Sequence, residues 1–231
     1  MANHDPNFDG LFPETPEEKK AEFFGALTWY LEARNWAHDK MRSCPTGSPG
    51  FDVRMYHSLY FVYLVGAVDC VGGYLQGQAQ ENFSKRIWEA VRPERKGGYV
   101  RVLRNAIVHQ GFNLTTAGHA EGTTLREYCP KAVKDRTGTY ERPFKYLGEL
   151  AEHCDGIVNP AIRHVLHDLD FFNPEPEGIN VDKLQAFIRQ ADCPDFVKEL
   201  APKIIAENYP IWAPQMKATA IKNMRRLLGE G

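Results

Sequence analysis

The chain has 231 residues, which is enough for one sizeable domain or for one domain with a small appendage. Its hydrophobic content of 43% is ordinary for a soluble globular protein and argues against a disordered chain. The formal net charge of −2 excludes a protein that coats nucleic acid indiscriminately. Any affinity for nucleic acid should therefore be confined to a local basic patch and should be sensitive to salt.

The cysteines and the N-terminal residues predict a cytoplasmic protein. The five cysteines are scattered, odd in number and without a C-x-x-C pair, as expected for reduced thiols. Residues 1–9 show no basic start followed by an apolar core, so no secretion signal is expected. Residues 59–75 are apolar, but these 17 residues include Asp69 and three glycines, whereas a membrane-spanning helix needs about 20 residues. We interpret this segment as a buried core helix and expect no membrane association.

Helix signals begin at residues 15–18, Thr-Pro-Glu-Glu, which supply a capping threonine, a proline in the first turn and a glutamate three residues after the cap. The first helix is expected to reach about Met41. A second helix, capped by Asp52, is expected to reach about Gln80 and to be the most buried element. A shorter third helix is expected from residue 81 to residue 91.

Residues 101–111, Arg-Val-Leu-Arg-Asn-Ala-Ile-Val-His-Gln-Gly, combine an apolar helical face with polar groups that a core helix does not need. Gly111 is placed to end this helix, because glycine readily adopts the left-handed conformation that closes a helix. Arg104 and His109 are five positions apart and diverge by about 140° on a straight helix. A shared site therefore requires a helix that ends or bends near His109, or a second subunit.

The chemistry of these side chains suits metal-free phosphodiester transfer. Imidazole titrates near neutral pH and passes protons, and a guanidinium binds phosphate oxygens through paired hydrogen bonds. In such a reaction an RNA 2′-hydroxyl attacks the adjacent phosphorus, with His109 as proton acceptor or donor. Arg104 neutralises the charge that builds on the phosphoryl oxygens.

The hexapeptide 104–109, Arg-Asn-Ala-Ile-Val-His, resembles the R-N-x-x-x-H signature of the HEPN superfamily. These all-helical domains include metal-independent ribonucleases, toxins such as HepT, and defence effectors. The resemblance implies a helical bundle that dimerises so that two copies of the motif line one RNA-cleaving cleft, with Arg104 and His109 essential and Asn105 supporting. Gly111 occupies the position at which HepT-type toxins carry a tyrosine that a paired nucleotidyltransferase antitoxin modifies, so the resemblance does not extend to that mode of regulation.

The leading prediction is a cytosolic, homodimeric, metal-independent endoribonuclease that needs no cofactor. Such an activity would suit a toxin or an antiviral defence effector, with a protein antitoxin or regulator as a further partner. One alternative is a non-catalytic HEPN-like helical module that binds a protein, a nucleotide or RNA. A second alternative is a metal enzyme that uses His164, His167 and Asp168.

Four further residues are candidates for supporting roles. Asp69 lies in the buried helix and needs a partner, for which Arg104 is one candidate; the alternative is another polar group or water. Arg95, Lys96 and Arg101 precede or begin the motif and are interpreted either as RNA-binding residues that steer phosphates or as parts of a solvated loop.

Histidine, cysteine and aspartate, which are all metal ligands, recur in the next helical stretch, which runs from about residue 143 to residue 172 with an interruption at residues 159–160. His153 and His164 lie about 16 Å apart on a continuous helix and cannot share an ion. His164 can chelate with His167 or Asp168, but a third ligand must come from elsewhere. We therefore predict no metal site and interpret these residues as the polar face of a helix.

The domain prediction is an all-α, HEPN-like helical bundle with a small C-terminal helical extension. Residues 1–14 form a flexible lead-in, residues 15–172 the bundle, residues 173–180 an acidic, proline-rich linker and residues 181–231 the extension, with helices at about 181–190, 194–208 and 211–228. Residues 113–142 are predicted to be a long loop insertion with a short hairpin near residues 135–138. Because this insertion follows His109, it is expected to act as a specificity loop or lid.

Overall fold

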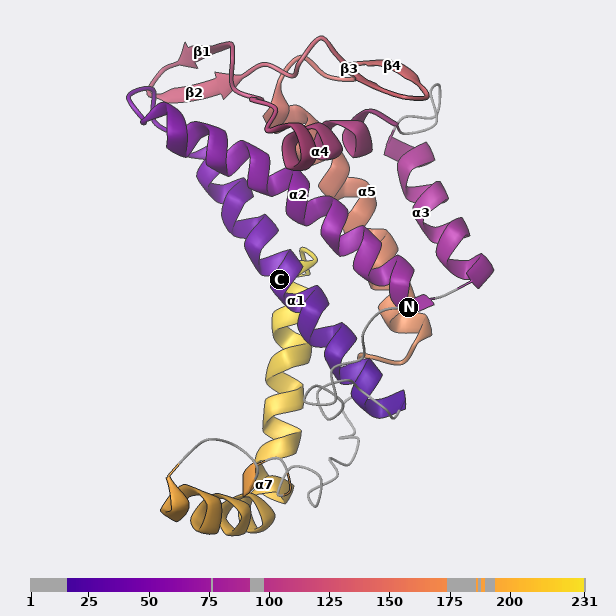
Figure 1. Ribbon diagram of the computed structural model, residues 1–231, viewed down its shortest axis with the longest axis vertical. Coiled ribbons are helices and arrows are strands. Elements are labelled where there is room, and N and C mark those ends of the chain that lie inside the picture. Colours follow the sequence, from indigo (N-terminus) through magenta and orange to yellow (C-terminus); the bar gives the residue numbers. More distant parts are fainter. Residues whose placement is uncertain are drawn as a thin grey trace. The chain divides into compact units, whose positions relative to one another are not determined.

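A computed structural model of the chain describes residues 16–75, 77–91, 98–173, 186, 188, 189 and 194–230. Its helices are α1 (Pro16–Arg42), α2 (Gly50–Leu75), α3 (Gly77–Val91), α4 (Gly98–Gln110), α5 (Leu147–Asp168) and α7 (Asp195–Leu227) (Figure 1). The predicted helical fold class is therefore confirmed. The predicted lead-in, nearly all of the predicted linker and most of the predicted helix at 181–190 lie outside the described residues.

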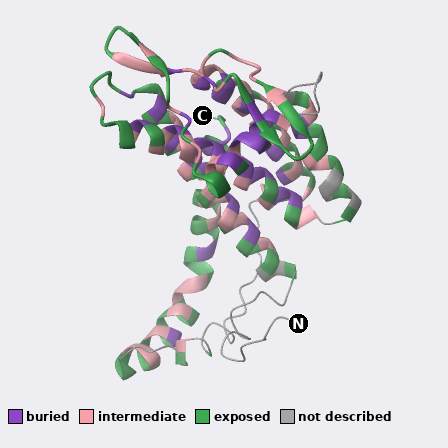
Figure 2. Ribbon diagram, turned by 45° about the horizontal axis from the view of Figure 1, so that its top comes forward, coloured by how far each residue is buried: buried purple, intermediate pink, exposed green. Residues whose placement is uncertain are grey.

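Helix α2 is the core of the bundle and packs against α1, α3 and α4. Tyr60, Phe61, Leu64 and Val68 on this helix are fully buried. Figure 2 shows buried residues concentrated along these helices. By length and composition alone, α2 could cross a membrane, but the core helix of a soluble protein passes the same criterion. The structure is compatible with a soluble protein.

The predicted boundary between the second and third helices was wrong. Helix α2 ends at Leu75 and α3 begins at Gly77, four residues before the predicted start. The backbone of Gly77 has a φ of 53°, in the left-handed region that favours glycine and interrupts a right-handed helix. Asp52 also lies inside the first turn of α2 rather than at its cap, because the amide of Val53 already donates to the carbonyl of Pro49.

The predicted insertion at 113–142 contains two antiparallel hairpins. Strands β1 (Gly118–Glu121) and β2 (Thr124–Glu127) form the first, and β3 (Ala132–Asp135) and β4 (Gly138–Glu141) form the second. The second confirms the predicted hairpin, whose turn is fixed by Asp135 Oδ1 accepting hydrogen bonds from the Thr137 amide and hydroxyl and from the Gly138 amide. The second hairpin packs against α4 and so lies beside the motif.

Two predicted interruptions at prolines are not present. Helix α5 continues through Pro160, and α7 runs from Asp195 to Leu227 through Pro202, Pro210 and Pro214, where two separate helices were predicted. Proline removes one backbone donor and bends a helix, but flanking turns that keep their own hydrogen bonds carry the helix past it.

A buried arginine joins α1 to the end of α7. Arg34 is fully buried, and its guanidinium donates to Asn35 Oδ1, to Asn159 Oδ1 and to the carbonyl oxygen of Leu227. Asn35 donates to the same carbonyl at 3.0 Å. Because the last carbonyls of a helix have no partner within the helix, this interaction satisfies an acceptor that burial would otherwise leave unpaired.

Asp155 on α5 supplies the counter-charge for Arg34. One carboxylate oxygen lies 3.5 Å from the guanidinium and accepts a hydrogen bond from the Tyr60 hydroxyl at 2.8 Å, and the other lies 2.9 Å from His38 Nδ1. Burial by itself would raise the pKa of Asp155, but the bond to His38 and the positive charge of Arg34 lower it below its usual range. Asp155 is therefore ionised at neutral pH.

The chain divides into two compact units. One comprises residues 1–165 and 227–229, and the other comprises residues 166–226 and 230–231. The first unit contains helix α4, both hairpins and the side chains bonded to Arg34 and Asp155, which we call the Arg34 network. The candidate site therefore lies within that unit.

Candidate functional site

The motif occupies the last two turns of α4. Helix α4 ends at Gln110, and Gly111 follows with a φ of 61°, as predicted from the sequence. The amide of Phe112 returns to the carbonyl of Ala106 at 3.1 Å and so caps the last turn. Leu103 and Ala106 face the core, while His109 is exposed. The helix end therefore presents the imidazole to solvent on a rigid element.

Arg104 is held by two neighbours. Its Nη2 lies 3.5 Å from Asp69 Oδ2 on α2, and its Nη1 donates to Asn105 Oδ1 at 2.9 Å. Both interpretations of Asp69 apply in part: Arg104 lies at the carboxylate, and the side chain, which was expected to need a buried partner, is 49% exposed to solvent. The Nε of Arg104 is buried and has no hydrogen-bond partner among the residues that the structure describes. Asp69 and Asn105 thus fix the orientation of the guanidinium through its two terminal nitrogens.

Arg104 and His109 do not converge within one chain. Helix α4 is continuous through Gln110, so the divergence of about 140° between positions five residues apart applies to this pair. Asn105 and His109, by contrast, are four residues apart and share one face of the helix with Arg101. Of the conditions stated above for a shared site, the helix does end next to His109, at Gln110, but it does not bend before His109. His109 therefore keeps its helical direction, and a second subunit is the other way to bring both side chains to one site.

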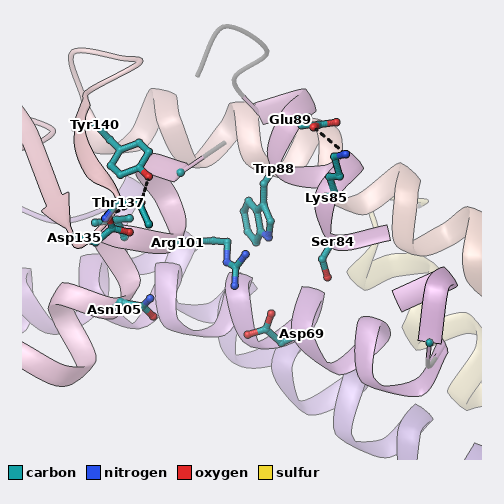
Figure 3. Close-up of a pocket in the computed structure, with 13 residues that line it drawn as sticks. Asp69, Ser84, Lys85, Trp88, Glu89, Arg101, Asn105, Asp135, Thr137 and Tyr140 are labelled. Carbon is teal, nitrogen blue, oxygen red and sulfur yellow. Dashed lines mark hydrogen bonds and ion pairs between the residues drawn. The ribbon is translucent and has the colours of Figure 1, made fainter. Parts of the chain in front are cut away.

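A cleft of about 850 Å³ lies beside this face of α4. Its walls come from α2, α3, α4 and the second hairpin, and Figure 3 shows the side chains that line it. The lining includes Asp69 from α2, Ser84, Lys85, Trp88 and Glu89 from α3, Arg101 and Asn105 from α4, and Asp135, Thr137 and Tyr140 from the hairpin. The sequence predicted Asp69, Arg101 and Asn105 as site residues but not the residues of α3.

The structure describes one of the three predicted RNA-binding residues. Arg101 is exposed and lines the cleft. Arg95 and Lys96 lie outside the described residues. Burial raises the pKa of Asp69, against the opposite effect of the positive charges on Arg104 and Arg101. The positive charges of Arg104 and Arg101 thus both act on this one carboxylate.

The histidines and acids of α5 are dispersed. Asp155 belongs to the Arg34 network, and His153 contacts the ring of Phe144. Within the described ranges, no three or more histidine, cysteine, aspartate or glutamate side chains are grouped so that they could hold a metal ion. The suggested set of His164, His167 and Asp168 is therefore not assembled into such a group.

Sequence reasoning missed the network of Arg34, His38, Tyr60 and Asp155. A signal was present, because Arg34 and His38 continue the helical spacing of Leu27 and Leu31, and polar residues on an apolar stripe must find buried partners. The network lies away from the cleft lining and ties helices together.

Comparison of the chain with models of protein families, with curated proteins and with solved structures found no match.

Proposed function

We propose that the protein is a metal-independent endoribonuclease of HEPN type that cleaves RNA by 2′-hydroxyl transesterification at a dimer interface. His109 serves as general acid or base, Arg104 binds the phosphoryl oxygens and Asn105 fixes the position of Arg104. The carrying observation is the arrangement of α4, which presents an exposed imidazole on its last turn and a guanidinium oriented by Asp69 and Asn105 one turn earlier.

The reaction divides between the two groups. The imidazole takes the proton of the 2′-hydroxyl as the oxygen attacks phosphorus, and it or its counterpart returns a proton to the departing 5′-oxygen. The products are a 2′,3′-cyclic phosphate and a 5′-hydroxyl. The guanidinium stabilises the extra negative charge of the pentacovalent state, and its attachment to Asp69 and Asn105 reduces the reorganisation needed during the reaction.

Helix geometry supports a dimer. Because the two side chains diverge on α4, a cleft that holds both near one phosphate draws Arg104 from one subunit and His109 from the other. Nη2 of Arg104 lies 3.5 Å from the Asp69 carboxylate, so this nitrogen is only partly available to a ligand. A phosphate that binds Arg104 therefore competes with the ion pair. A second subunit that brings its own cation or imidazole shifts that competition.

The test is cleavage of a mixed single-stranded RNA by purified protein in excess EDTA, with analysis of the product ends. We expect cyclic phosphate ends from the wild type and a loss of at least about 100-fold in His109→Ala and Arg104→Ala. Two matched controls, His167→Ala on the last turn of α5 and Arg86→Ala on α3, should cleave as the wild type does.

Three results would contradict the proposal in different ways. Cleavage that survives His109→Ala assigns the activity elsewhere. Cleavage abolished by EDTA and restored by a metal ion indicates a metal-dependent reaction in place of the proposed one. No cleavage by a folded dimer that still binds RNA, protein or nucleotide indicates a non-catalytic module.

A further inference from the structure

One face of α4 forms a continuous side of the cleft. Gly98, Arg101, Val102 and Asn105 line it, at the spacing of three and four residues that places side chains on one face. His109 is the next residue in this row. Arg101 and His109 are eight residues apart, which is about 12 Å along the helix axis. The cleft therefore leads from the start of α4 toward the imidazole.

The floor of the cleft contains an unused hydrogen-bond donor. Trp88 is only 3% exposed, and its Nε1 is buried without a partner in the described part of the chain. The indole N–H can only donate, and leaving such a donor unpaired costs about 1 to 3 kcal/mol. In Figure 3 the indole nitrogen is directed into the cavity on the side of Arg101 and Ser84. An acceptor atom of a ligand would satisfy it.

Arg101 is the cation of the cleft that has no hydrogen bond or ion pair among the described residues. Lys85 lies 4.0 Å from Glu89, and Asp69 lies beside Arg104. Asp135 accepts three hydrogen bonds within its own turn, and these lower its pKa, so it is already satisfied. The charge of Arg101 also acts on Asp69, but no hydrogen bond holds its guanidinium among the described residues, so the guanidinium N–H groups can donate to an anion.

The first turn of α4 adds a second source of positive potential. Gly98 is the first residue of this helix and lines the cleft, so the positive end of the helix dipole lies at its wall. A Cβ at position 98 would lie 2.1 Å from the ring of Tyr140, so glycine permits the second hairpin to close against this helix start. The hairpin and the helix terminus together enclose the region around Arg101 and Trp88.

We propose that this cleft is a phosphate subsite for the RNA strand, in which Arg101, the indole N–H of Trp88 and the start of α4 bind a phosphate displaced from the one that is cleaved. The inference rests on the proposed function, because it treats His109 as the reacting end of the same row. An anion with several acceptor oxygens matches a guanidinium, a single N–H donor and a helix terminus. A separation of about 12 Å means that a substrate reaching both points extends beyond the scissile dinucleotide.

The experiment measures cleavage of a 12-nucleotide single-stranded RNA and of a dinucleotide by Arg101→Gln and Trp88→Phe. Arg86→Gln and Trp36→Phe are matched controls, because both residues are absent from the cleft lining. For the 12-mer, we expect Arg101→Gln to raise KM roughly tenfold and to reduce the salt dependence of log KM by about one, with kcat unchanged. Trp88→Phe should raise KM about threefold to tenfold. The dinucleotide should be cleaved equally by all four variants and the wild type.

Direct binding separates this inference from the proposed function. A fluorescent 12-nucleotide DNA strand, which lacks the 2′-hydroxyl and cannot be cleaved, should bind wild type and His109→Ala equally and Arg101→Gln about tenfold more weakly. If the wild type cleaves no RNA but this dependence on Arg101 is observed, the catalytic proposal fails and the subsite stands. If RNA is cleaved but KM, salt dependence and DNA binding are unchanged in both Arg101→Gln and Trp88→Phe, the subsite is refuted.

Free phosphate distinguishes the source of the bound group. Inorganic phosphate at millimolar concentration should compete only weakly with the 12-mer, because the strand adds contacts along the row. Competition by inorganic phosphate at micromolar concentration would identify a site for a free phosphate ligand and overturn its assignment to RNA. Failure of Trp88→Phe to fold would leave the decision to Arg101→Gln, whose side chain is exposed.

Discussion

The guanidinium of Arg104 lies 3.5 Å from the carboxylate of Asp69, so a residue of the motif on α4 is tied to the core helix α2. Side-chain exposures of 27% for Arg104 and 49% for Asp69 place the pair at the edge of the core, where both groups reach solvent. An ion pair in this setting contributes little to stability, but it fixes the direction of the guanidinium. Its effect is therefore expected in activity rather than in folding.

Replacement of Asp69 tests this separation. Asp69→Asn keeps the shape of the side chain and removes its charge, so kcat/KM for RNA should fall about tenfold as the charge-assisted hydrogen bond to Arg104 is lost. Burial raises the pKa of Asp69, which means that the site disfavours its ionised form, so the melting temperature should not fall. The measurement pairs thermal unfolding with cleavage kinetics. Unaltered kinetics would show that Asp69 does not position Arg104, and a lower melting temperature would show that the pair acts on folding instead.

His57 predicts how stability depends on pH. It is buried in α2, and burial lowers its pKa to about 4, against a smaller opposing effect of its hydrogen bond to the Val53 carbonyl. The unfolded chain binds this proton near pH 6.5 and the folded chain only near pH 4, so the stability that His57 retains above pH 6.5 is lost as the pH falls toward 4. At pH 5 the loss is about 2 kcal/mol relative to pH 7.

The matched variant is His57→Gln, which cannot titrate. Denaturant unfolding at pH 7 and pH 5 should show a decrease for the wild type that exceeds the decrease for the variant by about 2 kcal/mol. Equal decreases in both proteins would mean that the imidazole is protonated in the folded chain. His167→Gln on α5, where the histidine is exposed, serves as the control and should leave the wild-type pH dependence unchanged.

The residues that could be predicted from the sequence are those whose structure is set by near neighbours. The end of α4 at Gly111 depends on one glycine with a positive φ, and the hairpin turn at 135–138 depends on an aspartate that bonds two and three residues ahead. The first hairpin was missed because strand β1 is almost entirely exposed and so lacks alternation of apolar and polar residues.

Residues joined over long distances in the chain could not be predicted. Arg34 bonds Asn159, 125 residues away, and no local pattern specifies that partner. The ion pair of Asp69 with Arg104 was one of two open interpretations, because a carboxylate on an apolar helix indicates that a polar partner or water is needed but does not identify it. Trp88 could not be identified as a site residue from the sequence, because only the packing of α3 brings its indole to the cleft.

The Arg34 network predicts a large loss of stability on removal of its counter-charge. Asp155→Asn leaves a fully buried guanidinium without a carboxylate, which should lower the free energy of unfolding by about 3 to 5 kcal/mol. Because the pKa of Asp155 is lowered in the folded chain, the stability that the ionised carboxylate adds should be lost in the wild type as the pH falls below the usual pKa of an aspartate and through the lowered one.

Chemical unfolding of three variants at pH 7 checks this prediction. Asp39→Asn removes an exposed carboxylate from the same helix as Arg34 and should change stability by less than about 0.5 kcal/mol. The double variant Arg34→Met with Asp155→Leu should be more stable than Asp155→Asn, because it leaves no unpaired charge. A single variant as stable as the wild type would show that Asn35, Asn159 and the Leu227 carbonyl suffice to hold the guanidinium.

The last prediction concerns the two subunits of the proposed dimer. If each site takes Arg104 from one subunit and His109 from the other, a heterodimer of an Arg104→Ala chain with a His109→Ala chain contains one intact site and one site that lacks both residues. Random exchange of subunits should then restore about a quarter of the wild-type activity from two inactive proteins. Denaturing and refolding the variants together, followed by the RNA cleavage assay, measures the recovery against each variant refolded alone.

Recovery also depends on the total protein concentration, since dilution below the dissociation constant of the dimer separates the two halves of the site. Absence of recovery, with heterodimers demonstrated by mass spectrometry, would mean that both residues act from the same chain, which the continuous helix through Gln110 permits only if the bound phosphate is reached from two faces of α4.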